Sequence, residues 1–383
     1  MQRKKILWLV SWYPNRNDSF DGDFIQRHAR AAAIFHDIHV IFVTSHLDPD
    51  VPEELSFATG LTEQVIYFKA SHGLFWGFKK MLHFNRLFRE AVNNYLKNKG
   101  RPDLIHVHVP WKAGLVALWA KEKYGIPFLL TEHWGGYNQR VEHNFFRKPA
   151  AVRDLTKKIY AEAKAFITVS NFLADEVKAV VGRGADALIP NVVDTTQFFQ
   201  KPEKYSKFSF IHVSNMVPLK NVGSILEAFK QLLEVSGRAD LQLILAGNRD
   251  QHYPRMAAAM GLLNRSVFFR GEISYPEVAD EMKRCHTMIL FSDSETFSCV
   301  TAEALCAGLP VIASETGALS ELINESNGIL VPAGDRQALV AAMGRMLDLY
   351  PAFDTPAISK AASNRYGYAR VAEDFDRLYR AYC

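Results

Sequence analysis

Short apolar runs alternate with longer stretches of helical spacing along almost the whole chain. Each apolar run has the length of a strand buried on both faces, and each longer stretch places its apolar residues on one side of a helix. Such alternation is typical of βα units, which build parallel sheets, so we predict an α/β protein. In the first half the expected strands are residues 6–10, 38–43, 65–68, 104–107, 128–131 and 166–169, and the expected helices are residues 23–35, 79–97, 112–124 and 171–181.

The second half repeats this pattern after a polar segment. Residues 195–206 contain a proline and lack periodicity, as linkers do. We therefore expect two domains, at residues 1–195 and 196–363, followed by a single amphipathic helix over residues 365–382. The strands expected in the second domain are residues 208–213, 241–246, 267–270, 287–291, 311–313 and 329–331.

Composition narrows the class of protein. A chain of 383 residues exceeds one ordinary core, and a formal net charge of +4 with mixed signs is too weak to indicate nucleic-acid binding. No apolar run approaches the roughly eighteen residues of a membrane-spanning helix, and the apolar start of the chain lacks a signal-peptide cleavage pattern. The four cysteines have no paired metal-ligand spacing, so we expect a reduced, cytoplasmic setting.

The most informative stretch runs from Glu295 to Glu303. It follows the apolar run 287–291 and continues into a short helix, which Gly308 and Pro310 would end before the next strand. Ligands of such strand–loop–helix units bind beyond the carboxyl ends of the strands. The first N–H groups of the helix suit an anion, and the two glutamates could accept hydrogen bonds from two sets of hydroxyls. A ligand with a phosphate between two groups of hydroxyls is a nucleotide-sugar, so the stretch predicts a nucleotide-sugar site.

This stretch with its flanks resembles the Glu-x7-Glu motif of retaining GT-B glycosyltransferases, closest to glycosyltransferase family 4 (GT4). The resemblance implies two Rossmann-like, doubly wound domains that face each other across a cleft. It places a nucleotide diphosphate sugar mostly on the C-terminal domain, a glycan or lipid-linked acceptor on the N-terminal one, and the helix 364–383 back on the N-terminal domain. The implied activity is metal-independent, hexosyltransferase-type transfer in polysaccharide or glycolipid biosynthesis, with no cofactor.

The resemblance also assigns roles to residues of the second domain. Glu295 would hold sugar hydroxyls and Glu303 the ribose, while Lys220 and the N–H groups at the start of the helix would stabilise the leaving diphosphate. Asn215 stands where the family usually has arginine, and Ser298 where it usually has glycine, so the serine side chain could crowd the phosphate. The implied donor-binding residues are Gly22, Asn215, Lys220, Gly247, Arg270, Glu272, Glu295, Phe297, Ser298, Cys299, Val300 and Glu303.

The first domain contributes a glycine and several histidines. Gly22 permits positive φ and close backbone approach in the loop after the first strand, where the family usually has Gly-Gly and this chain has Asp21-Gly22. His133 resembles the histidine that faces the donor sugar, so the implied catalytic residues are His133, Lys220 and Glu295. His106 and His108 share one strand face and could form a metal pair. Because no third ligand is evident, we interpret them as core or site-wall histidines and predict no metal site.

Residues 72–97 combine aromatic and basic side chains. One interpretation is an amphipathic helix that makes a peripheral contact with an anionic membrane. The other is a domain helix with a solvated basic face, which we favour.

Two alternatives to sugar transfer remain open at this point. One is a GT-B-fold enzyme of another kind, a nucleotide-sugar epimerase or a phosphorylase. The other is an inactive subunit that binds a nucleotide-sugar, and the departures at Asn215 and Ser298 are its only support. Loop residues at strand ends select the sugar, the nucleobase and the acceptor, so the sequence names none of them.

Overall fold

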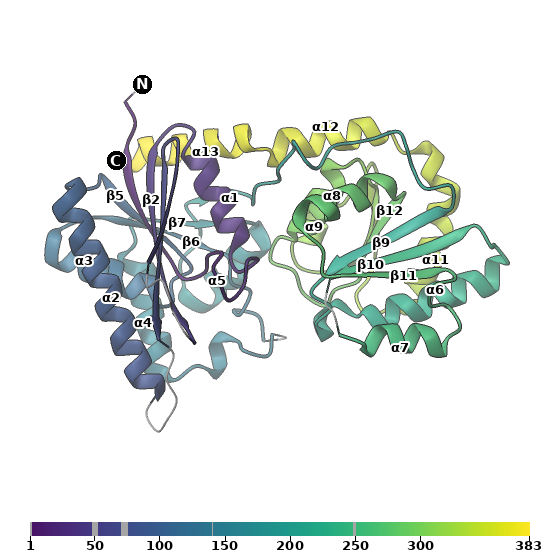
Figure 1. Ribbon diagram of the computed structural model, residues 1–383, viewed down its shortest axis with the longest axis horizontal. Helices are drawn as coiled ribbons and strands as arrows, with labels where there is room; N and C mark the ends of the chain where they lie inside the picture. The colour runs from purple at the N-terminus through teal and green to yellow at the C-terminus, as the bar shows by residue number, and fades with distance from the viewer. Residues whose placement is uncertain (1, 48–52, 70–75, 140, 248–249) are drawn as a thin grey trace. The chain divides into compact units, whose positions relative to one another are not determined.

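The computed structural model describes residues 2–47, 53–69, 76–139, 141–247 and 250–383 (Figure 1). The chain divides into two compact parts. The N-terminal unit comprises residues 1–192 and 368–383, and the C-terminal unit comprises residues 193–367. These limits lie close to the predicted ones at residues 195 and 363. Each unit is built on its own, mostly parallel sheet, so the prediction of an α/β protein is confirmed.

The N-terminal unit has an eight-stranded sheet in the order β3-β4-β2-β1-β5-β6-β7-β8. β3 is antiparallel to β4, and the other neighbouring strands are parallel. The strands are β1 (Lys5–Val10), β2 (Asp37–His46), β3 (Glu53–Ala58), β4 (Leu61–Lys69), β5 (Leu104–His108), β6 (Phe128–Glu132), β7 (Ala165–Thr168) and β8 (Ala187–Leu188). The helices are α1 (Asp23–Ala32), α2 (Trp76–Lys99), α3 (Ala113–Tyr124), α4 (Ala150–Glu162), α5 (Asn171–Val181) and α13 (Tyr368–Tyr382), with a 3₁₀ turn η1 (Phe145–Arg147).

All six strands and all four helices predicted for the first half are present, with β3, β8 and α4 in addition. These additional elements have little apolar sequence. β3 is an edge strand whose side chains are mostly exposed, and β8 has two residues. α4 buries Thr156, Ile159 and Tyr160, which is too narrow an apolar stripe to stand out in the sequence.

The C-terminal unit has a six-stranded parallel sheet in the order β11-β10-β9-β12-β13-β14. Its strands, β9 (Phe208–Ser214), β10 (Leu241–Gly247), β11 (Val267–Gly271), β12 (Thr287–Leu290), β13 (Val311–Glu315) and β14 (Gly328–Pro332), confirm the six predicted there. Its helices are α6 (Val222–Ser236), α7 (His252–Ala259), α8 (Tyr275–Arg284), α9 (Cys299–Cys306), α10 (Leu319–Leu322), α11 (Arg336–Leu349) and α12 (Thr355–Tyr366), with 3₁₀ turns η2 (Pro218–Lys220) and η3 (Tyr350–Ala352).

Both sheets reverse their strand order beside their first strand. In the N-terminal unit the order runs outward from β1 to β2 on one side and from β5 onward on the other. In the C-terminal unit the reversal lies between β9 and β12. The loops that leave the two strands at such a point run in opposite directions, which opens a crevice at the carboxyl ends. Each unit therefore offers one topologically favoured place for a ligand.

The end of the chain differs from the prediction of a single helix. Gly367 has an extended conformation (φ −67°, ψ 159°) and separates α12 from α13. A side chain there would place its Cβ 2.7 Å from the carbonyl oxygen of Ser363, so the sharp break needs a glycine. α13 belongs to the N-terminal unit, where Phe375 and Tyr379 enter the core beside Trp8.

The basic stretch predicted around residues 72–97 forms α2 over its described part, and residues 72–75 lie outside the described ranges. Phe84 and Phe88 are buried and Arg86 and Arg89 are exposed. The apolar side of α2 thus contributes to the domain core, which favours the interpretation as a domain helix. No described helix is both long enough and apolar enough to span a membrane.

We expect Tyr379→Phe to destabilise the N-terminal unit by about 1–3 kcal/mol, because it leaves a buried donor without a partner. The indole N–H of Trp8 donates to the Tyr379 hydroxyl at 3.0 Å, and this hydroxyl also bonds His106 Nδ1 at 2.8 Å. Urea unfolding followed by tryptophan fluorescence measures the loss. Tyr382→Phe, on the partly exposed end of the same helix, is the matched control. Equal stability of the two variants would contradict the expectation.

Candidate functional site

An ion pair spans the strand-order reversal of the C-terminal unit. Lys220 follows β9 in η2, and Glu295 follows β12 in the next loop. The Lys220 ammonium donates to Glu295 Oε1 although the two residues lie 75 positions apart, and their side chains are 20% and 10% exposed. The reversal between β9 and β12 explains this meeting, because it makes the two loops neighbours. A positive and a negative group, both largely withdrawn from water, therefore lie at the favoured edge of the sheet.

Backbone contacts fix the two loops that carry this pair. The Asp293 N–H donates to the carbonyl oxygen of Leu219 at 2.9 Å, and the Asn221 side chain donates to Asp293 Oδ1 at 2.6 Å. Asn221 has a positive φ of 47° and Met216 one of 54°, a conformation that costs side-chain-bearing residues energy. The surrounding bonds hold the strained loop, so Lys220 is presented from a rigid turn.

Glu295 is also held from the other side. The Ala318 N–H donates to the Glu295 carbonyl oxygen at 3.0 Å. Gly317 makes this approach possible, since a Cβ there would lie 2.1 Å from the same oxygen. The position of Glu295 is thus set by its backbone as well as by its salt bridge.

The helix after Glu295 begins at an unusual residue. Ser298 has φ 72° and ψ 81°, the left-handed region that favours glycine. Its hydroxyl accepts from the Thr301 N–H at 3.4 Å and lies 2.8 Å from the Thr301 hydroxyl. The serine side chain is therefore turned onto α9 as its N-cap. Cys299 and Val300 are the first two residues of α9, so their backbone N–H groups lie at the positive end of the helix dipole.

Glu303 lies further along α9 and is almost fully buried, with 3% of its surface exposed. Its Oε1 accepts from the hydroxyl of Tyr275, the first residue of α8, at 3.0 Å. The sequence did not predict a role for Tyr275. Ser274 and Glu277 form a capping box that starts α8 at this residue, but no local pattern pairs Tyr275 with Glu303. A buried carboxylate with a tyrosine partner adjoins the α9 N-terminus.

The other predicted residues of this unit lie along the same carboxyl edge. Asn215 is exposed just beyond β9, and Gly247 ends β10 with φ 142° against the Ser214 carbonyl. Arg270 pairs with Glu281 at 2.9 Å, so its guanidinium is engaged by α8. The remaining two differ in burial: Glu272 is exposed, and Phe297 is buried against Tyr366. The Phe297 side chain is therefore part of the packing of this unit.

In the N-terminal unit, Gly22 has the predicted positive φ, 63°. A Cβ at this position would lie 2.6 Å from the carbonyl carbon of Trp12, so the loop after β1 folds back on itself through a glycine. The sequence predicted a close backbone approach at Gly22, and in the structure Gly22 approaches the backbone of Trp12. It places the N-terminus of α1 next to the end of β1.

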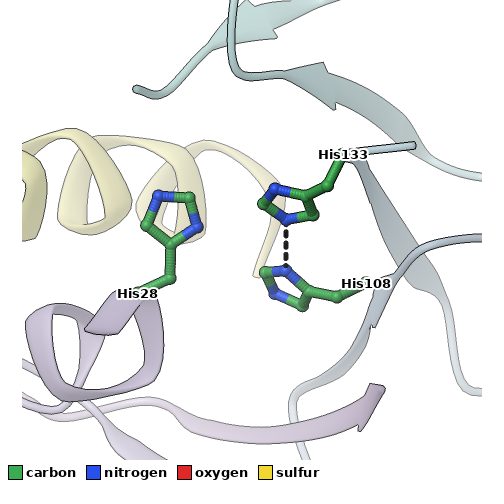
Figure 2. Close-up of side chains that lie close together, drawn as sticks. All are labelled: His28, His108 and His133. Atoms are coloured by element: carbon green, nitrogen blue, oxygen red, sulfur yellow. Dashed lines mark hydrogen bonds between the residues drawn. The ribbon is translucent and has the colours of Figure 1, made fainter. Parts of the chain in front are cut away.

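Figure 2 shows three histidines of this unit, His28, His108 and His133, whose rings lie close together. His108 Nδ1 and His133 Nε2 are hydrogen-bonded at 3.1 Å, and the third ring, His28 on α1, has a nitrogen that faces them. One nitrogen of each ring lies within 4.8 Å of the other two. The sequence paired His108 with His106 instead, but His106 bonds Tyr379 and Thr131. His28 was missed because nothing local in the sequence places α1 beside β5.

Burial keeps these three rings neutral. It lowers the pKa of His28 to about 4 and those of His108 and His133 well below the ordinary value. His28 Nε2 lies 2.8 Å from the Pro190 carbonyl oxygen, to which its N–H donates, so Nδ1 carries a lone pair. Neutral imidazoles can ligate zinc, and within the described ranges this is the single group of three candidate ligands so close together. An ion would have to replace the His108–His133 hydrogen bond, and the absence of a metal site stays a prediction.

Both units match known protein families. Residues 24–197 match the model described as Glycosyltransferase Family 4, and residues 207–348 match that described as Glycosyl transferases group 1. A glycogen synthase of Mycobacterium tuberculosis is 26% identical over 284 residues, which cover 72% of this chain and 66% of that enzyme. The match therefore spans just under two thirds of the length of this relative.

Two solved structures share the fold of the chain. Sucrose-phosphate synthase of Thermosynechococcus elongatus has a TM-score of 0.80 and 21% identity, with 99% of each chain covered. HepE of Anabaena, in complex with UDP-glucose, has a TM-score of 0.71 and 18% identity, with 99% of this chain and 100% of that chain covered. At these identities the likeness concerns the fold.

We expect stability to fall as pH drops below about 6.5, because the buried histidines take up protons only on unfolding. In the C-terminal unit, burial lowers the pKa of His212 to about 4. Between that value and the unfolded pKa near 6.5 the unfolded state binds more protons, so stability rises with pH by up to about 1.4 kcal/mol per pH unit for each such histidine.

Melting temperatures measured from pH 7.5 to pH 5 test this. His212→Gln should lose less on acidification than the unsubstituted protein. His252→Gln, at an exposed histidine, is the control and should follow the unsubstituted protein. Identical pH profiles for all three proteins would show that His212 is protonated in the folded state.

Proposed function

Because this chain belongs to glycosyltransferase family 4 and has the GT-B fold, we propose that it is a retaining hexosyltransferase whose donor is a nucleotide diphosphate sugar. The acceptor would be a glycan or a lipid-linked acceptor, in polysaccharide or glycolipid biosynthesis. One observation carries the proposal: Lys220, Glu295 and the start of α9 converge at the strand-order reversal of the C-terminal unit. HepE, which holds UDP-glucose, supports a nucleotide-sugar donor.

The ion pair suggests how the donor would be received. In the free protein Glu295 neutralises the Lys220 ammonium. A diphosphate at the α9 N-terminus would draw Lys220 toward its own charge, with the N–H groups of Cys299 and Val300 as further donors. Glu295 would then be free to accept hydrogen bonds from sugar hydroxyls. Donor binding would thus replace the Lys220–Glu295 ion pair by two contacts, one from Lys220 to the diphosphate and one from the sugar hydroxyls to Glu295.

The remaining donor contacts follow the same edge. Glu303, which Tyr275 holds by a hydrogen bond to Oε1, would accept from the ribose hydroxyls. The nucleobase would lie near residues 270–272 and meet their backbone, because the Arg270 side chain is engaged by Glu281. Asn215, in place of the usual arginine, leaves Lys220 as the main positive charge on the diphosphate.

Catalysis would rest on stabilising the leaving diphosphate. Lys220 and the helix N-terminus supply that charge stabilisation, which is the largest single effect in many transferases. We propose that no divalent ion is needed, because these groups take its place. His133 would face the donor sugar as a neutral ring. Its Nε2 is occupied by His108, so Nδ1 is the nitrogen left to bond a sugar hydroxyl. Retention would follow from attack on the face that the diphosphate leaves.

The relatives do not favour the alternatives of an epimerase or an inactive subunit. A lipid-linked acceptor would bring the protein to a membrane surface on the cytoplasmic side. The exposed Arg86 and Arg89 of α2 are the charges that would meet anionic lipid there. Flotation with anionic vesicles tests this contact, and an Arg86→Glu, Arg89→Glu variant should float less.

Lys220→Ala should lower turnover on the order of 10²–10³-fold, because it removes one preorganised charge from the leaving group. Release of UDP or GDP from a panel of nucleotide-sugars, with excess EDTA in parallel, measures the effect. EDTA should leave the rate of the unsubstituted protein unchanged. Lys230→Ala, on the solvent side of α6, is the matched control and should keep full turnover. Full turnover of Lys220→Ala would falsify the assigned role.

A further inference from the structure

The N-terminal unit has a cavity at its own strand-order reversal. It measures about 200 Å³ and is lined by residues that follow β1, β5 and β6, among them Trp12, Trp111 and Trp134. Ligand crevices form at such reversals because the neighbouring loops part there. The cavity is separate from the Lys220–Glu295 region, which lies in the other unit.

The loop that forms one wall of the cavity is fixed in a strained conformation. Val109 and Lys112 have positive φ values of 64° and 72°, which side-chain-bearing residues rarely adopt. The Ser11 hydroxyl donates to the Val109 carbonyl at 2.9 Å and accepts from the Ala113 N–H at 3.3 Å. Strain held by such bonds is found where a site must be shaped before its ligand arrives.

The walls of the cavity are aromatic. Trp12, Trp111 and Trp134 are each half-buried, so part of each indole remains open. All three line the cavity. Tyr137 is buried behind Trp134 with ring centroids 5.3 Å apart, which fixes that wall. Indole faces bind flat apolar surfaces, of which the face of a sugar ring is one.

The charged side chains that line the cavity are lysines. Lys112, His143 and Lys148 line it, and its described lining contains no Asp or Glu. Lys148 lies over the Trp134 ring at 5.8 Å from the centroid. Lys112 is half-buried, and burial lowers its pKa, partly offset by the carboxylate of Asp21 in the neighbouring hollow. A pocket with cations and no lining carboxylate favours an anion and disfavours a cation.

We propose that this cavity is the acceptor subsite and that it selects an acceptor with an anionic group, a carboxylate or a phosphate, beside an apolar face about the size of one sugar ring. This assignment rests on the proposed function, since only a transferase needs an acceptor. The tryptophans hold the apolar face, and Lys112 and Lys148 pair with the anion. The carboxylate of an acidic sugar and the phosphate of a sugar or prenyl phosphate share this chemistry.

Tryptophan fluorescence tests the proposal without any donor. Methyl glucuronide and methyl glucoside differ only in the carboxylate, and we expect the glucuronide to quench the fluorescence with at least tenfold tighter binding. Glucose 6-phosphate and farnesyl phosphate, titrated in the presence of saturating UDP, show whether a phosphate source is preferred. Trp134→Phe should reduce the amplitude of the quench, which locates the ligand in the cavity.

Charge variants decide whether the cavity makes the selection. Lys148→Glu should remove the preference for the anion, while Lys157→Glu, an exposed lysine of α4, should keep it. Equal binding of neutral and anionic ligands, no quench by any anion, or an unchanged preference in Lys148→Glu would overturn the proposal. The failure of the proposed function looks different: no nucleotide would then be released from any donor, whatever the outcome of these titrations.

Discussion

The partly buried ion pair between Lys220 and Glu295 is the contact on which the C-terminal site depends. Each group is largely withdrawn from water, so each would be costly to leave alone, and the pair satisfies both. In the proposed donor site this arrangement would favour a diphosphate, because the ammonium is already partly desolvated and positioned before a ligand binds. An anion that replaces the carboxylate does not have to remove water from the lysine first. Part of the desolvation cost of Lys220 is therefore already met in the folded protein before a ligand binds.

The same topological rule operates in both units with different chemistry. Between β9 and β12 the reversal brings together a lysine, a glutamate and a helix N-terminus. Beside β1, the loops after β1, β5 and β6 bring together tryptophans, lysines and a strained loop pinned by Ser11. In the same unit, His28, His108 and His133 stay neutral because burial makes the charged form too costly. The ligands that we propose differ accordingly: a diphosphate at one crevice, and at the other an anion that adjoins an apolar face.

Much of this was accessible from the sequence, because parallel strands are buried on both faces and appear as apolar runs. The twelve predicted strands and the frame around Glu295 and Glu303 follow from that. Partners across the fold were not accessible: Tyr275 meets Glu303, and His28 meets His133, through pairings that no local pattern encodes. The break at Gly367 was missed because the apolar stripe continues on both sides of it, and the stripe outweighed the one glycine.

Ser298 shows how a departure from a family pattern can be absorbed by its surroundings. A left-handed residue at the start of α9 favours glycine, since a Cβ costs roughly 1 kcal/mol in that conformation. Serine introduces that cost, but its hydroxyl caps the helix through the Thr301 N–H, and a cap contributes a similar amount. Because the hydroxyl is bound to Thr301, the side chain points along the helix instead of across the N–H groups of Cys299 and Val300. The serine that the sequence suggested would crowd a phosphate is therefore bonded to its own helix, and the cost of its backbone conformation is offset by the cap.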